Sequence, residues 1–310
     1  MEYLQKLFNK NAATEQRREI PEKLLIDFNI SHCFAEMRAR AVHIINTIAE
    51  YSQTGRKLLR QAHKDGYRLI MTAAAGWAGQ VDADHKCICL NACETDSHLI
   101  ETLAHECRHI QQFSRGVDYG CGAYNIKDAI LLHRCKEADA EAFAAAVCHE
   151  IRLHSGNEEP WKAFAAGRPF VAAGLEKARR NNAKPTVTPA MLRSAFNGWY
   201  EDDKLMRVYE ENYIVDGILK ECSAPRAEIK DFFHKKTTSA EIVSQVCIDT
   251  AGACYWAHEP SVLDERHRLL VNDETLNRAR EVLTDIEKRT GIRQNHSYRS
   301  LPRRPVKALQ

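Results

Sequence analysis

Two histidines and a glutamate stand at a spacing that suits a metal ion. The pentapeptide His105-Glu106-Cys107-Arg108-His109 reads His-Glu-x-x-His. Residues four apart share one face of a helix, so the two imidazoles can bind one divalent ion, typically zinc. The glutamate beside the first histidine can then reach a water on that ion and act as its general base. The pattern predicts a hydrolytic metal site with His105 and His109 as ligands and Glu106 as the catalytic base.

The surrounding sequence supplies the helix that this spacing requires. Thr95, Asp96 and Ser97 are good N-cap residue types just before the segment. An apolar stripe at helical spacing consists of Leu99, Leu103, Cys107 and Ile110. A neighbouring stripe carries His98, Thr102, His105, His109 and Gln112. The sequence therefore predicts a helix with one apolar face and, beside it, a face rich in ligands.

A third ligand is expected, because catalytic zinc sites hold three protein ligands and a water. A second helix is predicted from about Asn125 to Ile151, and His133, Glu137 and Glu141 interrupt its apolar pattern. They are four apart and share one side of the helix. Ionisable groups beside an apolar face are costly to bury without partners, and a metal would supply one. All three are candidates for the third ligand.

The two helices together resemble the gluzincin zinc metallopeptidases. In several branches of that group the second helix carries a ligand glutamate in a register that Glu137-Ala138-Asp139-Ala140-Glu141-Ala142-Phe143-Ala144 matches. The resemblance implies Glu137 as the third ligand, with Glu141 where Asp or Asn is more usual. The chain also resembles short bacterial metallopeptidases of the minimal gluzincin type, in which residues corresponding to Arg108 and Gln112 recur. The resemblance covers roughly residues 30 to 150.

The resemblance implies a zinc-dependent peptidase that binds one Zn²⁺ per chain and hydrolyses peptide bonds through a metal-activated water. A further donor usually steadies the developing oxyanion in such reactions. Tyr119, Tyr124 and His133 are candidates, with Tyr213 further along, and the sequence does not choose among them. The predicted strand at residues 85–91, just before the metal-binding helix, would form the edge that pairs with an extended peptide.

The predicted fold class is α+β and mostly helical, with a zincin-like core of a small sheet, the zinc-binding helix and the glutamate-bearing helix. Strands are expected at residues 67–72 and 85–91, with a turn at 76–79. The expected organisation is an N-terminal segment (1–29), a zincin-like metallopeptidase domain (30–155), a helical C-terminal region (156–287) and a disordered basic tail (288–310). The tail has seven Lys and Arg and no Asp or Glu.

Composition sets limits on the remaining properties. A hydrophobic content of 44%, a charged content of 28% and a net charge of +2 are ordinary for a globular protein. We expect a protein or peptide substrate and no nucleic-acid partner, because basic charge is concentrated only in the tail. No run approaches the roughly 18 apolar residues of a membrane span, so none is expected. No pattern indicates the oligomeric state.

Eleven cysteines and no secretory signal pattern at the N-terminus suggest free thiols in a cytoplasmic protein. An effector exported by a non-classical route would have the same pattern. Cys87, Cys89 and Cys93 form a cluster that a soft metal could use. Two alternatives to a general peptidase stay open. One is a regulatory or structural metalloprotein that cleaves only a specific partner or none, and the other is a non-enzymatic helical interaction protein.

Overall fold

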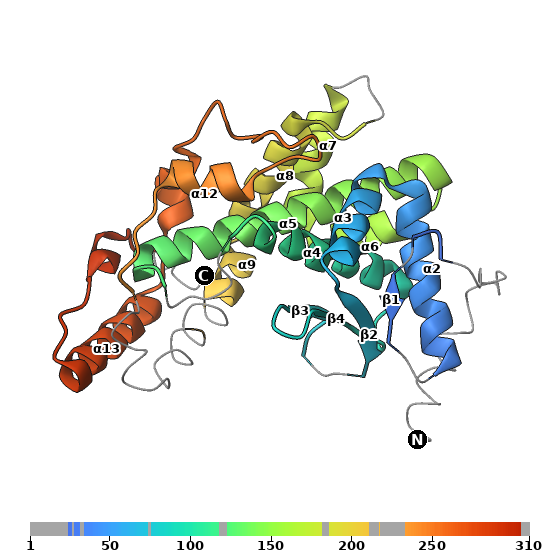
Figure 1. Cartoon of the computed structure of the whole chain (residues 1–310). Helices are drawn as coiled ribbons and strands as arrows, with labels where there is room; N and C mark the ends of the chain where they lie inside the picture. The colour runs from blue at the N-terminus through green and yellow to red at the C-terminus, as the bar shows by residue number, and fades with distance from the viewer. Residues whose placement is uncertain are drawn as a thin grey trace, which may run out of the picture. The chain divides into compact units, whose positions relative to one another are not determined.

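The structure is a computed structural model. It describes residues 24–26, 28–31, 34–73, 76–117, 123–181, 186–210, 217 and 233–304. Helices dominate these residues, and short strands form one four-stranded sheet (Figure 1). The predicted class, α+β and mostly helical, is confirmed. Tyr119 and Tyr213, together with most of the predicted N-terminal segment and the last six residues, lie outside the described part of the chain.

The elements alternate between strands and helices in the first third of the chain and are helical afterwards. The strands are β1 (Asn29–Ile30), β2 (Arg68–Thr72), β3 (Gly79–Asp82) and β4 (Cys87–Asn91). The helices up to the glutamate-bearing one are α2 (Ala35–Tyr51), α3 (Gln53–Lys64), α4 (Asp96–Phe113) and α5 (Ile126–Ser155). The later helices are α6 (Glu159–Gly167), α7 (Pro169–Arg180), α8 (Pro189–Glu201), α9 (Asp203–Tyr209), α12 (Ser239–Val246) and α13 (Asp273–Thr290). Single 3₁₀ turns are η2 (Val262–Asp264), η3 (Arg266–Leu269) and η4 (Ser297–Ser300).

The sheet has the strand order β1-β2-β4-β3, with β3 antiparallel to β4 and the other pairs parallel. β2 and β4 occupy the two segments predicted as strands. The last residue of the predicted turn at 76–79 belongs to a strand instead, because β3 begins at Gly79. The expectation that the strand before the metal-binding helix forms the sheet edge is wrong. β4 lies between β2 and β3, and β3 is the edge strand beside it.

The chain packs as two compact units, and α5 contributes to both of them. The first comprises the described residues up to Ser114 together with Ala140–Ala195, and the second comprises Arg115–Asp139 and the described residues from Phe196. This division runs differently from the predicted domains, whose boundaries stay a prediction.

In the first unit, α4 packs on the sheet at β3 and β4, and α2, α3 and α6 pack against α4 (Figure 1). The contact with β3 is close, because a Cβ at Gly79 would lie 2.4 Å from Thr102 Cγ2. Glycine therefore lets the edge strand approach α4 one turn before the His-Glu-x-x-His motif. Thr95 caps α4, and its side chain accepts a hydrogen bond from the His98 N–H at 3.2 Å.

The helix boundaries of the later chain follow local signals in the sequence. Helix α6 ends at Gly167 and α7 begins at Pro169, a residue type that favours the first helical position. Thr238 and Glu241 form a capping box at the start of α12. None of the described helices has both the length and the apolar character that a membrane span needs.

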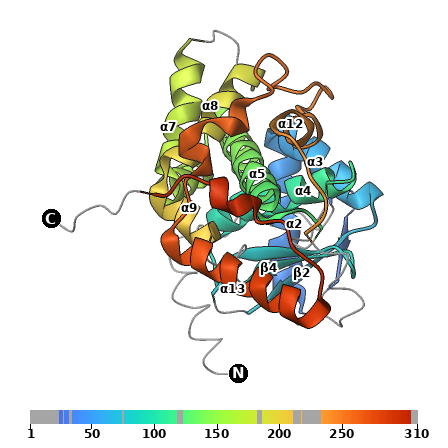
Figure 2. The same ribbon diagram turned by 90° about the vertical axis from the view of Figure 1, so that its left-hand side faces the viewer.

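The second unit has its own apolar core around α13. The core cluster consists of Ile126, Ile130, Phe233, Val271, Leu276, Ala279, Val282, Leu283, Ile286, Tyr298 and Leu301. Tyr298 and Leu301 lie in the segment 288–310, for which disorder is predicted and of which the structure describes residues 288–304. These two side chains are buried in the cluster, and the Arg304 N–H bonds to the Val271 carbonyl at 2.9 Å, so the segment is anchored beside α13 (Figure 2).

Candidate metal centre

Helix α4 brings its two motif histidines together on one face. The Nε2 atoms of His105 and His109 are 3.0 Å apart. The rings meet edge to face, with centroids 4.6 Å apart and planes at 85°. His109 is largely buried, and His105 retains some exposure. The helical spacing thus produces the paired imidazoles that a single metal ion could bind.

The opposite nitrogen of each ring faces an oxygen atom. His109 Nδ1 is 2.9 Å from Gln112 Oε1, and His105 Nδ1 is 3.7 Å from Glu141 Oε1. These oxygens favour a proton on Nδ1 of each ring, which leaves a lone pair on each Nε2. With both protons on Nδ1, the two Nε2 lone pairs would be available to one cation, and without a cation their 3.0 Å separation suits a hydrogen bond between the rings. The imidazole pair therefore fits a metal ion.

Glu137 on α5 completes the group of possible ligands. Ligand atoms of His105, His109 and Glu137 all lie within 4.8 Å of one another. Glu137 is largely buried. Among the described residues His133 and Glu141 are not part of this group, although both share the face of α5 with Glu137. A set of two imidazoles and one carboxylate is typical of divalent ions such as zinc, so the residues present fit the metal that the sequence predicts.

The two other motif side chains next to the histidines are also buried. Glu106 follows His105 directly and is only 7% exposed. Arg108 is fully buried, and its guanidinium lies 3.6 Å from the centroid of the Phe143 ring on α5. This cation–π contact joins the His-Glu-x-x-His helix to the glutamate-bearing helix. Arg108 therefore has a packing role beside the site.

Sequence reasoning missed two charged neighbours of the site, the partly exposed Arg168 and the buried Glu101. Arg168, between α6 and α7, places its Nε 2.6 Å from Glu141 Oε1. Glu101 lies four residues before His105 on α4, a helical spacing that could have identified it. Burial raises the pKa of Glu101. Its hydrogen bond to His98, with Nε2 and Oε1 3.1 Å apart, raises the pKa of His98 to about 9.

The candidates for oxyanion stabilisation are scattered. Tyr124 is half-buried and lies beside Lys235, whose Nζ is 5.7 Å from the centroid of the tyrosine ring. His133 is buried on α5. Tyr119 lies outside the described residues. The assignment of an oxyanion-stabilising residue stays a prediction.

The cysteine cluster differs from the imidazole site. Cys87 and Cys89 place their sulfur atoms 3.7 Å apart on β4, and Cys93 is exposed. Burial raises the pKa of Cys89 to about 11, which disfavours the thiolate that binds metals. The eight described cysteines form no disulfide, in agreement with the expectation of free thiols for that part of the chain.

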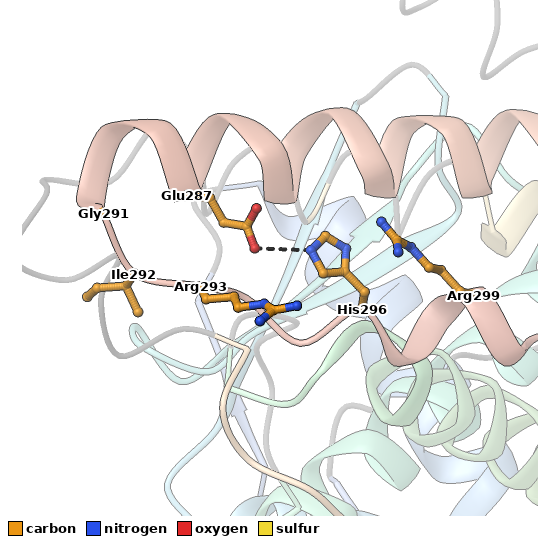
Figure 3. Close-up of a pocket in the computed structure, with 6 residues that line it drawn as sticks. All are labelled: Glu287, Gly291, Ile292, Arg293, His296 and Arg299. Atoms are coloured by element: carbon orange, nitrogen blue, oxygen red, sulfur yellow. Dashed lines mark hydrogen bonds and ion pairs between the residues drawn. The ribbon is translucent and has the colours of Figure 1, made fainter.

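A pocket of about 370 Å³ lies at the C-terminal end of α13, remote in sequence from the motif (Figure 3). Its lining consists of Glu287, Gly291, Ile292, Arg293, His296 and Arg299. The only carboxylate in that lining pairs with His296 at 3.0 Å and accepts the Gln294 N–H at 2.8 Å. This pocket contains no group of metal ligands, and the chemistry points instead to the motif on α4.

Comparison with known families gives one match. The model of the family described as "Putative metallopeptidase family (DUF6782)" matches residues 28–256, which include α4, α5 and all three candidate ligands. Neither the curated proteins nor the solved structures contain a match to the chain. The matched span is well over half of the 310 residues. The chain therefore belongs to this family of putative metallopeptidases, DUF6782.

Proposed function

We propose that the protein is a zinc-dependent peptidase of the gluzincin type that hydrolyses a protein or peptide substrate. His105, His109 and Glu137 would hold the ion, and Glu106 would be the general base. The observation that carries the proposal is the pair of Nε2 atoms 3.0 Å apart, with both Nδ1 atoms facing oxygens and a carboxylate of Glu137 in reach. Membership of the family supports the reaction class.

The chain's own residues have distinct tasks in this reaction. A bound zinc ion supplies Lewis acidity, which lowers the pKa of water towards neutrality and polarises the scissile carbonyl. Glu106 accepts the proton of the attacking water and delivers it to the leaving amine. Gln112 holds the Nδ1 side of His109, and Glu141 faces the Nδ1 of His105, so both Nε2 atoms remain available as ligands.

The edge strand β3 is the natural place for an extended substrate. It pairs with β4 on one side only, and edge strands present backbone groups to a partner peptide. The contact of Gly79 with Thr102 puts β3 against α4 one turn before His105. We therefore assign to β3 the role that the sequence suggested for β4. Gly79→Val would push β3 away from α4 and weaken substrate binding, measured as a higher KM.

Metal content tests the ligand set. Inductively coupled plasma mass spectrometry on the wild type is expected to give about one zinc per chain. Glu137→Ala should reduce it sharply, whereas Glu159→Ala, an exposed glutamate on α6, should leave it unchanged. A folded wild type that takes up no zinc after reconstitution would refute the metal site.

Hydrolysis tests the role of Glu106. Glu106→Gln should keep its zinc and lose about 10²- to 10⁴-fold in cleavage rate, the usual contribution of a general base. The cleavage rate is measured by mass spectrometry on a library of peptides. Equal cleavage by the variant and the wild type would remove Glu106 from the mechanism. Zinc binding without cleavage of any library peptide would favour the structural metalloprotein or one specific partner as substrate.

A further inference from the structure

Arg168 has a fixed position beside α4 because a helix ends there. Pro169 starts α7, and the Arg168 N–H donates to the Phe164 carbonyl in the last turn of α6 at 2.7 Å. Phe164 is completely buried, and α6 packs directly against α4. The backbone of Arg168 is therefore held next to the helix that carries the motif.

The Arg168 side chain and the candidate metal ligand His105 both lie close to the same oxygen atom of Glu141. Its Nε is 2.6 Å from Glu141 Oε1, and the same oxygen is 3.7 Å from His105 Nδ1. A terminal nitrogen of the guanidinium donates to the Gly167 carbonyl at 3.1 Å. The Glu141 side chain is 5% exposed and that of Arg168 is 30% exposed. A partly exposed arginine thus holds a buried carboxylate against an imidazole.

A second buried carboxyl group, that of Glu101, also interacts electrostatically with Arg168. Glu101 is 92% buried, one turn before His105, and its Oε2 has no hydrogen-bond partner among the described residues. Arg168 and Glu141 both act on it electrostatically, in opposite directions. The guanidinium therefore lies within reach of both carboxyl groups. Its charge offsets the repulsion that would otherwise push Glu141 away from Glu101 and from its position at His105.

We infer that Arg168 is a positioning residue of the metal centre: it holds Glu141 against His105 Nδ1, so that the imidazole keeps the tautomer and direction in which Nε2 faces the ion. The inference rests on the proposed metal site and adds a residue that no motif includes. Arg168 reaches the ion only through Glu141 and His105. Groups that orient a metal-binding histidine typically change metal affinity by about 10- to 100-fold when they are removed.

The first test is the zinc dissociation constant, measured by competition with a chromophoric chelator. Arg168→Ala should weaken binding about tenfold or more. Arg168→Lys should recover part of the loss, because a lysine keeps the charge but lacks the planar fork. Arg179→Ala is the matched control, since Arg179 on α7, the helix that follows Arg168, pairs with Glu176 at 2.9 Å and should leave the affinity unchanged. Unchanged affinity in Arg168→Ala would overturn the inference.

A double-mutant cycle tests whether Arg168 acts through Glu141. Once Glu141→Gln has removed the carboxylate, the further change Arg168→Ala should weaken zinc binding no more than twofold. Fully additive losses would show that Arg168 acts by another route, and the inference would then be wrong. Far-ultraviolet circular dichroism of each variant confirms that the comparison is made on folded protein.

Tautomer measurements separate this inference from the proposed function. If the wild type binds no zinc, the proposed metal site fails, but the contact with Glu141 can still be measured in the metal-free protein. ¹⁵N chemical shifts of His105 should report a proton on Nδ1 in the wild type and a mixture of tautomers in Arg168→Ala. Identical shifts in the two proteins would show that Arg168 does not position the ring.

Discussion

The two compact units each bury a polar cluster, and the clusters differ in the groups that compose them. In the first unit the Nε2 atoms of His105 and His109 lie 3.0 Å apart, and the carboxyl groups of Glu101 and Glu141 lie close by with Arg168. Two imidazoles with buried carboxylates nearby form a set of groups that a divalent cation could bind.

In the second unit the buried cluster is built around the guanidinium of Arg134, whose terminal nitrogens are hydrogen-bonded while its Nε has no partner among the described residues. The two terminal nitrogens of Arg134 donate to the carbonyls of Arg268 and Leu270 at 2.7 and 2.9 Å, and one of them bonds Glu210 at 3.1 Å. Glu210 also accepts the Asn272 N–H at 2.7 Å. Burial lowers the pKa of Arg134, and the charge of Glu210 opposes that effect. These contacts connect α5 to Glu210 and to the residues around η3 within the second unit.

Burial of charged groups therefore does not by itself identify a functional site. Both clusters contain nearly inaccessible ionisable groups. They differ in composition, since Arg134 contacts a carboxylate and two carbonyls, while His105 and His109 belong to a group of ligand atoms that could hold a metal ion. Variants of the two clusters should therefore separate stability from metal binding.

The largest effect is expected from Glu210→Ala. It leaves the buried Arg134 without its carboxylate, and breaking such a pair costs about 3–5 kcal/mol of folding free energy. Urea denaturation followed by fluorescence should show the shift of the midpoint, while the folded fraction keeps its zinc content. Asp285→Ala is the control, because Asp285 pairs with Arg289 at the surface and should cost under about 1 kcal/mol. A small shift for Glu210→Ala would show that the cluster is not structural.

At the imidazole cluster we expect a smaller effect of opposite sign, because zinc binding should increase the free energy of unfolding. Zinc at about 100 times its dissociation constant should stabilise the wild type by about 2.7 kcal/mol, because only the folded chain offers the assembled site. Glu137→Gln should lose most of this gain and unfold like the wild type treated with a chelator. Thermal melts with and without zinc measure the difference. A wild-type melting temperature that chelation leaves unchanged would show that the imidazole cluster binds no stabilising metal ion.

The sequence predicted the parts of the site that depend on local structure. The face shared by His105 and His109, the cap at Thr95 and the helix break at Pro169 all follow from spacing or residue type within a few positions. Glu137 follows from its register on a single helix, once the resemblance has selected it from three candidates. These features need no knowledge of how distant segments pack.

The parts that were missed depend on distant contacts. Gly79–Asp82 has little strand propensity, and it becomes a strand because it pairs with β4. Strand order, which moved β4 from the edge to the interior, is not encoded in either strand alone. Arg168 approaches Glu141 across 27 positions because α6 packs on α4. In the segment after α13, Tyr298 and Leu301 are enough to anchor a sequence that otherwise has the composition of a disordered tail.

The smallest expected effect is a pH dependence of stability that comes from His98, on the same helix as the imidazole cluster. The hydrogen bond to Glu101 raises the pKa of His98 from 6.5 to about 9. A raised pKa in the folded state gives stability that is fully present below about pH 6.5 and is lost as the pH rises through 9. The sign follows His98, which is the more solvated partner, although burial also raises the pKa of Glu101.

Metal-free wild type should therefore lose stability between pH 6.5 and 9.5, by less than about 1 kcal/mol because His98 is partly exposed. His98→Gln should reduce this loss, and His85→Gln, at a more exposed histidine on another turn, should retain it. Urea midpoints at several pH values measure the slope. A slope that is equal in the wild type and His98→Gln would mean that the His98–Glu101 pair does not retain its proton in the folded protein.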